Sequence, residues 1–284
     1  MWKHIFAEIL LKTGKEFKPI GSPQAISGGY INQGYRLNGE NSNYFVKFND
    51  SSLLPMFESE ALALLEINAL AKIKAPLPIS YGTVDQYSYL ILEWLNLSPG
   101  NAFSWYEMGK QLANMHLSPM GKLYGWERSN FIGNTPQNNY PTEVWADFFA
   151  EQRIAHQLKI AKGTFKNTEK TIEQVRKLLK NHQPTPSLVH GDLWSGNSGF
   201  TSNSEPIILD PAIYYGDREV DIAMTELFGG YPANFYRGYN SIVPLDIQYQ
   251  KRKFIYNLYH ILNHYNLFGS RYLIQAEQTI NQLF

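Results

Sequence analysis

The sequence lacks cysteine and has no excess of charge of either sign. Without cysteine there is no thiolate metal site and no disulfide, which fits a reducing compartment. The 25 Lys and Arg residues balance the 25 Asp and Glu residues, so no global electrostatic attraction favours nucleic acid or an anionic membrane. The seven histidines are scattered without metal-ligand spacing. We therefore expect neither a nucleic-acid nor a membrane partner.

Long apolar runs are also missing. No stretch approaches the roughly 18 apolar residues that span a bilayer. Residues 2–10 show helical spacing, but charged side chains interrupt it, and a signal peptide needs an uninterrupted apolar core. The expected compartment is the cytoplasm. At 284 residues and 44% hydrophobic content, the chain can form one large domain or two lobes.

The most informative stretch that is present runs from Leu188 to Pro211, LVHGDLWSGNSGFTSNSEPIILDP. Asp192 is followed five residues later by Asn197, and Asp210 closes a short apolar run. Phosphoryl-transfer enzymes have the same order and the same first spacing: a catalytic-loop Asp, a metal-binding Asn, and a later Asp that carries magnesium.

The chemistry explains why these residue types occur together. A carboxylate at Asp192 can accept or orient the proton of an attacking hydroxyl. Magnesium takes oxygen ligands, which the amide of Asn197 and the carboxylate of Asp210 supply. The alternative is an ordinary turn rich in Gly, Ser and Asn. The strand-like segments Ser187–Val189 and Pro206–Leu209 flank the motif as a kinase requires, so we predict a kinase.

The first quarter of the chain contains candidates for nucleotide binding. Gly28 and Gly29 lie in a predicted Gly-bearing hairpin over Ser27–Leu37, where the backbone can approach a phosphate closely, although an ordinary hairpin turn is the simpler interpretation. The strand Tyr44–Phe48 carries Lys47, and an amphipathic helix follows it. In kinases such a lysine pairs with the nucleotide phosphates and with a helix glutamate. Of Glu58, Glu60 and Glu66, we choose Glu60, near the start of the apolar run.

Two further strands precede a predicted lobe boundary. Ser80–Val84 and Tyr87–Trp94 are strand-like, and the second ends in a polar, turn-prone segment. We place an N-terminal nucleotide-binding lobe at residues 1–95 and a mainly helical catalytic and acceptor-binding lobe at 96–284. In a two-lobed kinase the link passes the adenine, so the backbones of Glu93, Trp94 and Leu95 are candidates for hydrogen bonds to the base.

The rest of the chain is predicted to be mostly helical. Helical spacing occurs at 105–117, 144–160, 167–181 and from 248 onward, and residues 121–139 are predicted to form a long loop that lines the acceptor side. His116, near a helix end, is interpreted as a capping or core residue, and Arg153 could be either structural or substrate-facing. The Asp-Phe-Gly of protein kinases is absent; Pro211 follows Asp210, so we expect a less switchable loop. Asp217 and Asp221 begin a helix, where a capping role is expected.

Several motifs together resemble the fructosamine kinase family, which belongs with aminoglycoside and choline kinases in the protein-kinase-like fold. The resemblance covers nearly the full length. It is carried by SGGYIN, FVK at 45–47, MFESEA at 56–61, GW at 125–126, IGNTPQNN at 132–139, HGDLWSGN at 190–197, DPAIYYGDRE at 210–219 and FGG at 228–230. HGDLWSGN followed by DPA and YYGDRE is specific within the fold, whereas HGD alone indicates only this broad class of phosphotransferases.

The resemblance implies an α+β, two-lobed fold with a small antiparallel sheet and a mainly helical second lobe. It also implies ATP-dependent phosphorylation of a sugar hydroxyl of ketosamines, a deglycation repair activity, with ATP and Mg²⁺ as cofactors. Asp192 would be the base, Asn197 and Asp210 the metal ligands, and Lys47, oriented by Glu60, would hold the phosphates.

On the acceptor side the resemblance implies two further candidates. Trp194 could lie against the sugar ring, with ordinary packing as the alternative, and Asp217 in YYGDRE is a second candidate for substrate contact. Some relatives carry a redox-sensitive cysteine in the Gly-bearing loop. Tyr30 occupies that neighbourhood here, so we predict no thiol switch.

Two other functions stay open at this point. The chain could be another small-molecule kinase of the same fold, acting on an aminoglycoside, choline or an amino alcohol; such cationic acceptors predict an acidic groove. It could also be a non-catalytic kinase fold used as a binding module. The presence of Lys47, Asp192, Asn197 and Asp210 argues against the binding module, because a pseudoenzyme commonly lacks one of them.

Overall fold

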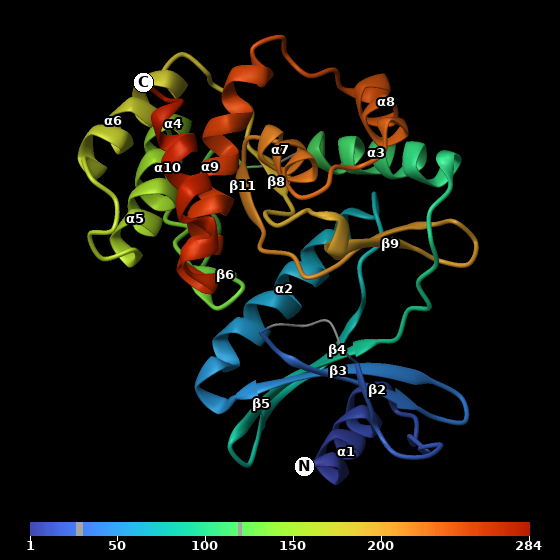
Figure 1. The fold of residues 1–284 in the computed structure, drawn as a ribbon. Coiled ribbons are helices and arrows are strands. Elements are labelled where there is room, and N and C mark those ends of the chain that lie inside the picture. The colour runs from blue at the N-terminus through green and yellow to red at the C-terminus, as the bar shows by residue number, and fades with distance from the viewer. Residues whose placement is uncertain (27–30, 119–120) are drawn as a thin grey trace.

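The computed structural model describes residues 1–26, 31–118 and 121–284. An antiparallel sheet lies at the N-terminal end of the molecule, and helices make up most of the remainder (Figure 1). The sheet has the strand order β1-β2-β3-β5-β4. Its strands are β1 (Gln24–Ile26), β2 (Gln33–Asn38), β3 (Asn43–Asp50), β4 (Pro78–Val84) and β5 (Tyr87–Glu93). This is the predicted α+β arrangement.

The alternation of side chains along β3 decides which residues reach the site. Successive side chains of a strand point to opposite faces of the sheet. Tyr44, Val46 and Phe48 pack in one apolar cluster with Ile5 and Ile9 of α1 (Trp2–Thr13), which covers that face. Lys47 has the opposite parity and therefore points to the other face, toward the helical part of the molecule.

Helix α2 (Leu54–Leu70) lies between the sheet and the helical part (Figure 1). It begins with Pro55 in its first turn, where a missing N–H costs nothing. Met56, Phe57, Ala61 and Leu64 are buried in the main core. Because its surroundings are apolar on more than one side, α2 is packed between two layers and is not a surface helix.

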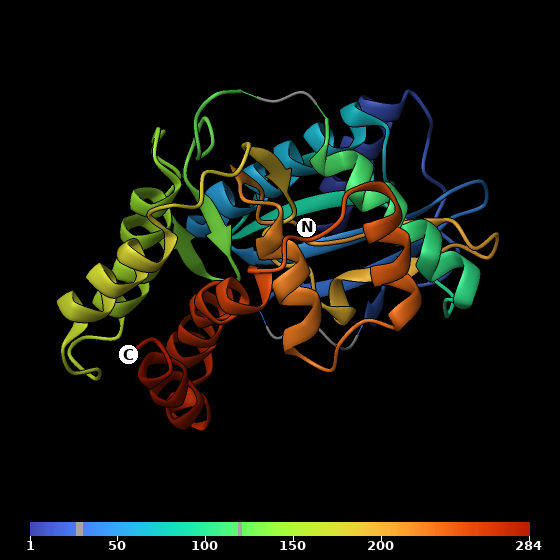
Figure 2. The same ribbon diagram turned by 90° about the horizontal axis from the view of Figure 1, so that it is seen from above.

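The helical part is built around α9 and the α3–α8 pair. Figure 2 shows α9 and α10 side by side at one end of the molecule, and α9 also contacts α5 and α6. A separate contact joins α3 to α8. The helices are α3 (Ala102–His116), α4 (Trp145–Asp147), α5 (His156–Ile160), α6 (Thr168–Leu179), α7 (Glu219–Leu227), α8 (Ala233–Ile242), α9 (Tyr249–Phe268) and α10 (Leu273–Asn281).

A π-helical segment, η2 (Phe148–Ala155), joins α4 to α5 into one continuous helix over residues 145–160. The sequence predicts a helix over 144–160, and the structure confirms it with this wider turn in its middle. Arg153 lies in the π segment and is fully buried. Its guanidinium faces the rings of Tyr214 and Phe148 and donates to the carbonyl oxygen of Asn138 and the amide oxygen of Asn139. Arg153 is therefore structural.

Two short antiparallel pairs hold the Leu188–Pro211 stretch. β8 (Ser187–Val189) pairs with β11 (Tyr214–Gly216), and β9 (Ser198–Phe200) pairs with β10 (Pro206–Ile208). The predicted strands before Asp192 and before Asp210 are confirmed. One expectation is wrong: residues 121–139 are not all loop, because β6 (Asn130–Ile132) and β7 (Thr135–Gln137) form a hairpin there. The short strands have no clear alternation of apolar residues that would have revealed them.

Short 3₁₀ turns complete the chain: η1 (Ser51–Leu53), η3 (Ser195–Asn197) and η4 (Ser270–Tyr272). Between β5 and α3 an extended segment connects the sheet to the helical part, and the predicted boundary after Leu95 falls within it.

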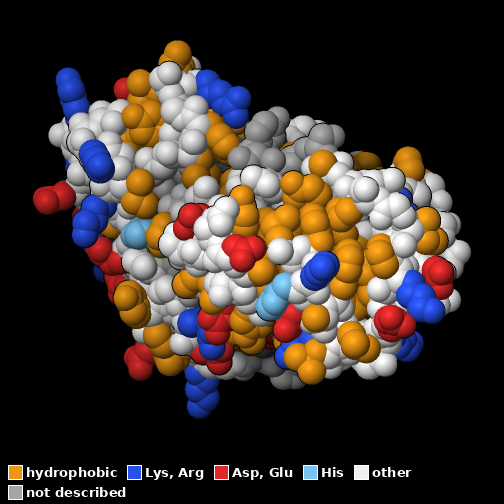
Figure 3. Space-filling view, turned by 90° about the horizontal axis from the view of Figure 1, so that it is seen from below, with side chains coloured by type: hydrophobic (Ala, Val, Ile, Leu, Met, Phe, Trp, Pro, Cys, Tyr) orange, Lys and Arg blue, Asp and Glu red, His pale blue; other side chains and the backbone are white. Residues whose placement is uncertain are grey.

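Basic and acidic side chains are interspersed on the face seen from below (Figure 3). Within the described ranges, no helix combines the length and apolar character needed to cross a membrane.

Candidate active site

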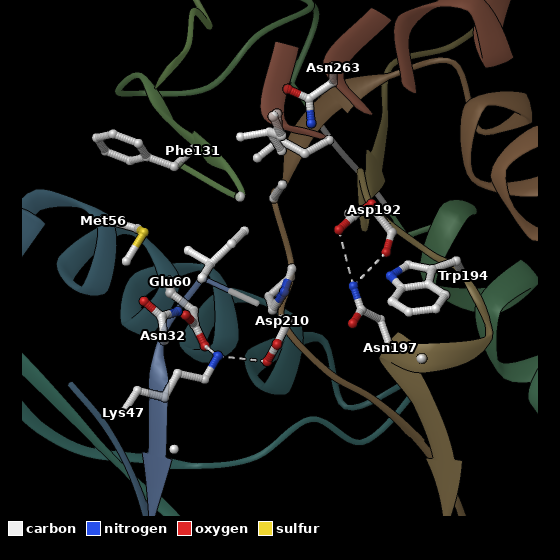
Figure 4. Close-up of a pocket in the computed structure, with 18 of the residues that line it drawn as sticks. Asn32, Lys47, Met56, Glu60, Phe131, Asp192, Trp194, Asn197, Asp210 and Asn263 are labelled. Atoms are coloured by element: carbon white, nitrogen blue, oxygen red, sulfur yellow. Dashed lines mark hydrogen bonds and ion pairs between the residues drawn. The ribbon is translucent and has the colours of Figure 1, made fainter. Parts of the chain in front are cut away.

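A cavity of about 600 Å³ lies between the sheet and the helical part. Residues from β2, β3 and α2 line one side, and the Leu188–Pro211 stretch, β6 and α9 line the other. Six of the predicted site residues line it together (Figure 4): Lys47, Glu60, Asp192, Trp194, Asn197 and Asp210. Residues far apart in the sequence therefore meet at one place; Lys47 and Asp210, for example, are 163 positions apart.

Lys47 joins two carboxylates from different parts of the chain. Its Nζ donates to Oε1 of Glu60 and to Oδ1 of Asp210, each at 2.7 Å. Burial alone would lower the pKa of Lys47, but the charges of Asp210 and Glu60 outweigh it and raise the pKa well above the usual range. The ammonium is therefore permanently charged, and it points into the cavity where a phosphate can bind.

The backbone of the loop before Asp192 is fixed by a buried carboxylate. Asp221 of α7 accepts the N–H of His190 at 2.7 Å and the N–H of Gly191 at 2.9 Å, and it also accepts from Nε2 of His116 at 3.1 Å. Burial favours the neutral acid, yet these hydrogen bonds and the neighbouring imidazoles keep the pKa of Asp221 below its usual value. Asp221 is thus not the helix cap expected from sequence; it fixes the backbone of the loop that precedes Asp192.

Gly191 and His190 complete this loop. Gly191 has φ of +81°, and a Cβ there would overlap the carbonyl oxygen of Ala212, so only glycine fits. Nε2 of His190 lies 2.8 Å from the carbonyl oxygen of Leu209, which can only accept, so this nitrogen carries the proton. Nδ1 then accepts the N–H of Asp192. Burial lowers the pKa of His190, which keeps the ring neutral.

Asp192 and Asn197 are joined directly. Nδ2 of Asn197 donates to the backbone oxygen of Asp192 at 2.9 Å and to its Oδ2 at 3.2 Å. Burial, with the nearby charge of Asp210 adding to it, raises the pKa of Asp192 to about 7. A carboxyl group with a pKa close to neutral can take a proton from a substrate and release it again.

Asp210 faces this pair across the cavity (Figure 4). Its backbone is left-handed, with φ of +52°, and the side chain is 54% exposed. Aspartate tolerates this conformation better than most residues, and Pro211 follows it directly. One carboxylate oxygen of Asp210 binds Lys47, and the amide oxygen of Asn197 points away from Asp192. Two oxygen donors of the kind that magnesium prefers thus remain available on opposite sides.

Trp194 is 38% exposed and lines the cavity next to Asp192. Its carbonyl oxygen accepts a hydrogen bond from the hydroxyl of Tyr231 at 3.1 Å, which fixes the backbone. The indole lies over Gly196, where any Cβ would overlap the ring. An aromatic face is thereby held at the edge of the cavity.

Asp217 does not lie at the cavity. It is 1% exposed, and its carboxylate is occupied by the hydroxyl of Tyr256 at 2.5 Å, by Nε2 of His182 at 2.7 Å and by the N–H of Glu219 at 3.0 Å. The N-cap residue of α7 is Arg218 and no side chain caps the helix, so Asp217 is not the predicted cap, although it accepts the N–H of Glu219, the first residue of α7. The expectation that Asp217 contacts substrate is therefore not supported, because every oxygen already has a buried partner.

Hydrogen bonds in the link after β5 show which of the three backbone groups predicted to bind the nucleotide base still has a free N–H. The N–H of Glu93 donates to the carbonyl oxygen of Leu77, and the N–H of Trp94 donates to that of Asn43. Neither N–H is free for a base. Leu95 makes no such backbone bond within the described part of the chain, so it is the remaining N–H donor. Leu97, which sequence reasoning did not select, lines the cavity. Gly28 and Gly29 lie outside the described residues.

Two further residues were not selected from the sequence: Glu66, which anchors α2 without lining the cavity, and Asn263, which lines it. Glu66 of α2 accepts from Nε1 of Trp126 at 2.8 Å and from the hydroxyl of Tyr215, tying α2 to the helical part. Asn263 of α9 lines the cavity but lies 53 residues after Asp210 in the printed sequence. Nothing in a single sequence distinguishes Glu66 from its helical neighbours, or Asn263 from other helix asparagines.

The arrangement can bind a triphosphate at Lys47 and present a hydroxyl to Asp192. A small-molecule kinase requires both features. The choline kinase LicA from Streptococcus pneumoniae superposes with a TM-score of 0.63 over 99% of both chains at 14% identity. A spectinomycin phosphotransferase superposes with a TM-score of 0.60 over 99% of this chain and 94% of the other, also at 14% identity. These likenesses establish the fold, which is that of aminoglycoside phosphotransferases and choline kinases.

The chain belongs to the fructosamine kinase family, whose model matches residues 1–284. A protein assigned as a ketoamine kinase in Synechocystis sp. is 50% identical over 99% of this chain and 96% of its own length. The chloroplastic protein-ribulosamine 3-kinase of Arabidopsis thaliana is 38% identical over 96% of this chain and 86% of its own. The crystal structure of a protein assigned as a fructosamine-3-kinase in Haemophilus somnus 129PT has a TM-score of 0.95 at 33% identity, covering 100% and 98% of the two chains.

Proposed function

We propose that this protein is an ATP-dependent kinase that phosphorylates a sugar hydroxyl of ketosamines, the adducts that form when sugars glycate amines. The observation that carries the proposal is the meeting of Lys47, Glu60, Asp192, Asn197 and Asp210 at one cavity, in a chain of the fructosamine kinase family. The physiological role would be deglycation repair, with a free or protein-bound ketosamine as the partner and the cytoplasm as the compartment.

Lys47 binds the phosphates of ATP in this proposal. Glu60 holds the ammonium in place from α2, and the base of the nucleotide lies toward Leu97 and the N–H of Leu95. Asn197 and Asp210 would hold Mg²⁺, because each has an oxygen free to face the cavity. When bound, the cation neutralises charge on the phosphates.

Asp192 serves as the base toward the acceptor hydroxyl. The hydroxyl oxygen forms a bond to the γ-phosphorus as the bond from that phosphorus to the β–γ bridging oxygen breaks, and ADP leaves. The proton of the hydroxyl passes to the carboxylate of Asp192. Asn197 and the His190 N–H···Leu209 contact keep this carboxylate in position. Positioning and charge neutralisation supply most of the rate acceleration in such reactions.

The acceptor lies on the side of the cavity where Asp192 and Trp194 meet. The exposed indole face of Trp194 offers apolar area to the C–H groups of a sugar. A ketosamine combines such C–H groups with several hydroxyls, so one hydroxyl can face Asp192 while the sugar chain packs on the indole.

The test is ATP consumption against a panel of ribulosamine, erythrulosamine and fructosamine adducts, with choline and aminoglycosides as comparison acceptors. We expect ADP formation and a phosphorylated product only with the ketosamines. Turnover with choline or an aminoglycoside and none with ketosamines would replace this proposal by another kinase of the same fold. Failure of Mg·ATP to raise the melting temperature would favour a non-catalytic binding module.

A further inference from the structure

Asn263 is a buried polar residue that reaches the cavity from α9. Asn263 is only 2% exposed, yet it lines the same cavity as Asp192. Figure 4 shows its amide nitrogen on the side that faces the interior of the cavity, above Asp192. None of the predicted roles of the nucleotide or magnesium residues involves α9, so this amide needs its own explanation.

The orientation of the Asn263 amide follows from a chain of hydrogen bonds. Nδ2 of Asn266 lies 3.0 Å from the backbone oxygen of Gln157 and 2.7 Å from its Oε1. A backbone carbonyl can only accept, so the Asn266 nitrogen is the donor and the Gln157 side-chain oxygen accepts. Nε2 of Gln157 must then donate to Oδ1 of Asn263, at 3.2 Å.

This chain leaves one group of Asn263 unsatisfied. Its oxygen is used by Gln157, and among the described residues Nδ2 has no acceptor. Nδ2 is not one of the fully buried polar atoms that lack a partner, so it is open to the cavity, where an acceptor atom of a ligand can pair with it. The two N–H groups are therefore presented to whatever enters the cavity beside Asp192. Gln157 fixes them as donors, because the reverse orientation would place two nitrogens against each other.

We propose that Asn263 is a specificity-determining residue that donates a hydrogen bond from Nδ2 to an oxygen of the acceptor's sugar chain. The proposal rests on the ketosamine kinase function and adds to it the group that recognises the sugar. The ligand chemistry required is an oxygen lone pair close to the hydroxyl that Asp192 deprotonates. A sugar chain with a carbonyl and adjacent hydroxyls supplies one. The quaternary ammonium head of a choline-like acceptor offers no lone pair to this donor.

The first experiment compares Asn263→Ala with the matched variant Asn257→Ala. Asn257 is also on α9 and 9% exposed, but it does not line the cavity. With N-fructosyl-lysine and N-ribulosyl-lysine as substrates, we expect Asn263→Ala to lower kcat/KM for the ketosamine about five- to tenfold, the worth of one hydrogen bond. The KM for ATP should stay unchanged. Asn257→Ala should leave both parameters at the wild-type values.

A second measurement identifies the interaction itself. Deoxy analogues of N-fructosyl-lysine, each lacking one oxygen, are tested on the wild type and on Asn263→Ala. With the wild type, one analogue should show a kcat/KM lower than that of the full substrate by about the same factor as the Asn263→Ala substitution causes. With the variant, that analogue and the full substrate should have equal kcat/KM, because the hydrogen bond is absent in both cases. If Asn263 were only structural, each analogue would lose the same factor in kcat/KM with the variant as with the wild type.

Asn263→Asp keeps the oxygen that Gln157 binds and replaces the donor by an acceptor, so it tests the proposal even where alanine disturbs packing. It should lower kcat/KM for the ketosamine more than alanine does, because two acceptors would then face each other. Wild-type kinetics of both variants, in an enzyme that phosphorylates ketosamines, would overturn the role of Asn263 alone. A wild type that phosphorylates no ketosamine would overturn the proposed function and this inference together.

Discussion

The role proposed for Asp192 sets two conflicting requirements, since a base must be close to the reacting centre yet able to carry charge there. Its environment is poor for charge: burial and the nearby Asp210 raise its pKa to about 7 in the structure without ligands. The folded protein therefore holds the proton more tightly than the unfolded chain does. The native state is destabilised as the pH rises from about 4 to about 7, and the penalty is fully present above that range.

Asp192→Asn should consequently abolish phosphoryl transfer while it stabilises the protein. In EDTA and without nucleotide, we expect a melting temperature about 2–5 °C above the wild type at pH 8, because the amide removes the buried charge. The gain should shrink at pH 5, where wild-type Asp192 is already protonated. Differential scanning calorimetry at both pH values checks this. An equal change at both would show that Asp192 carries no charge penalty in the fold.

Gly191 gives a second prediction at the scale of one residue. Gly191→Ala combines a left-handed backbone with overlap against the carbonyl of Ala212, so we expect a loss of more than about 2 kcal/mol of stability. Turnover should fall about 100-fold, since a displaced Asp192 no longer meets the hydroxyl. Gly163→Ala is the matched control: Gly163 has φ of +82° with open space around it and should show only the backbone cost of about 1 kcal/mol. Equal effects at both positions would contradict the steric argument.

At the scale of single residues, the sequence predicts those site residues whose roles follow from residue type and from order along the chain. Lys47, Asp192, Asn197 and Asp210 each follow from a spacing and a neighbouring strand, and they meet at one cavity. Asp221 and Asn263 could not be found in that way. The carboxylate of Asp221 acts through the backbone of residues 30 and 31 positions away, and Asn263 depends on the orientation of two other amides. Such roles are set by packing, which a single sequence does not display.

Helix α2 is held from both sides, and its three glutamates have three different tasks. Glu60 binds Lys47, Glu66 binds Trp126 and Tyr215, and Glu58 makes an exposed ion pair with Arg128 at 3.2 Å. The sequence identified the helix and favoured Glu60 by its place in the apolar run. Their different environments could not be derived, because all three lie within nine residues of one amphipathic pattern.

Glu66→Ala should loosen α2 from the helical part. Loss of two hydrogen bonds to a charged group should cost about 2–3 kcal/mol of stability and raise the KM for ATP, since α2 also carries Glu60. Glu58→Ala, which removes only an exposed ion pair, should cost less than about 0.5 kcal/mol and leave the KM unchanged. Urea denaturation and steady-state kinetics measure both effects. If Glu58→Ala had the larger effect, Glu66 would not be the residue that fixes α2.

The balance of charge over the whole molecule conceals a local imbalance. The formal net charge is zero, but the described lining of the cavity has three carboxylates, Glu60, Asp192 and Asp210, against one ammonium, Lys47. A triphosphate entering alone would meet net repulsion at short range, where water screens it least. The cavity is thus suited to a nucleotide whose charge a cation has already reduced.

Removal of divalent cations should therefore weaken ATP binding strongly. By isothermal titration calorimetry we expect the Kd for ATP to rise by at least about tenfold in EDTA relative to excess Mg²⁺. Asp210→Asn should lower the affinity measured in Mg²⁺ and reduce the difference between the two conditions. An equal Kd with and without the cation would remove Asn197 and Asp210 from the role proposed for them.

The three-way contact of Lys47 with Glu60 and Asp210 exists here before any ligand binds, and Glu66 anchors the helix that completes it. Within the described residues, this contact forms without a ligand. Because these contacts are already formed, no ligand binding energy is needed to bring Lys47, Glu60 and Asp210 together.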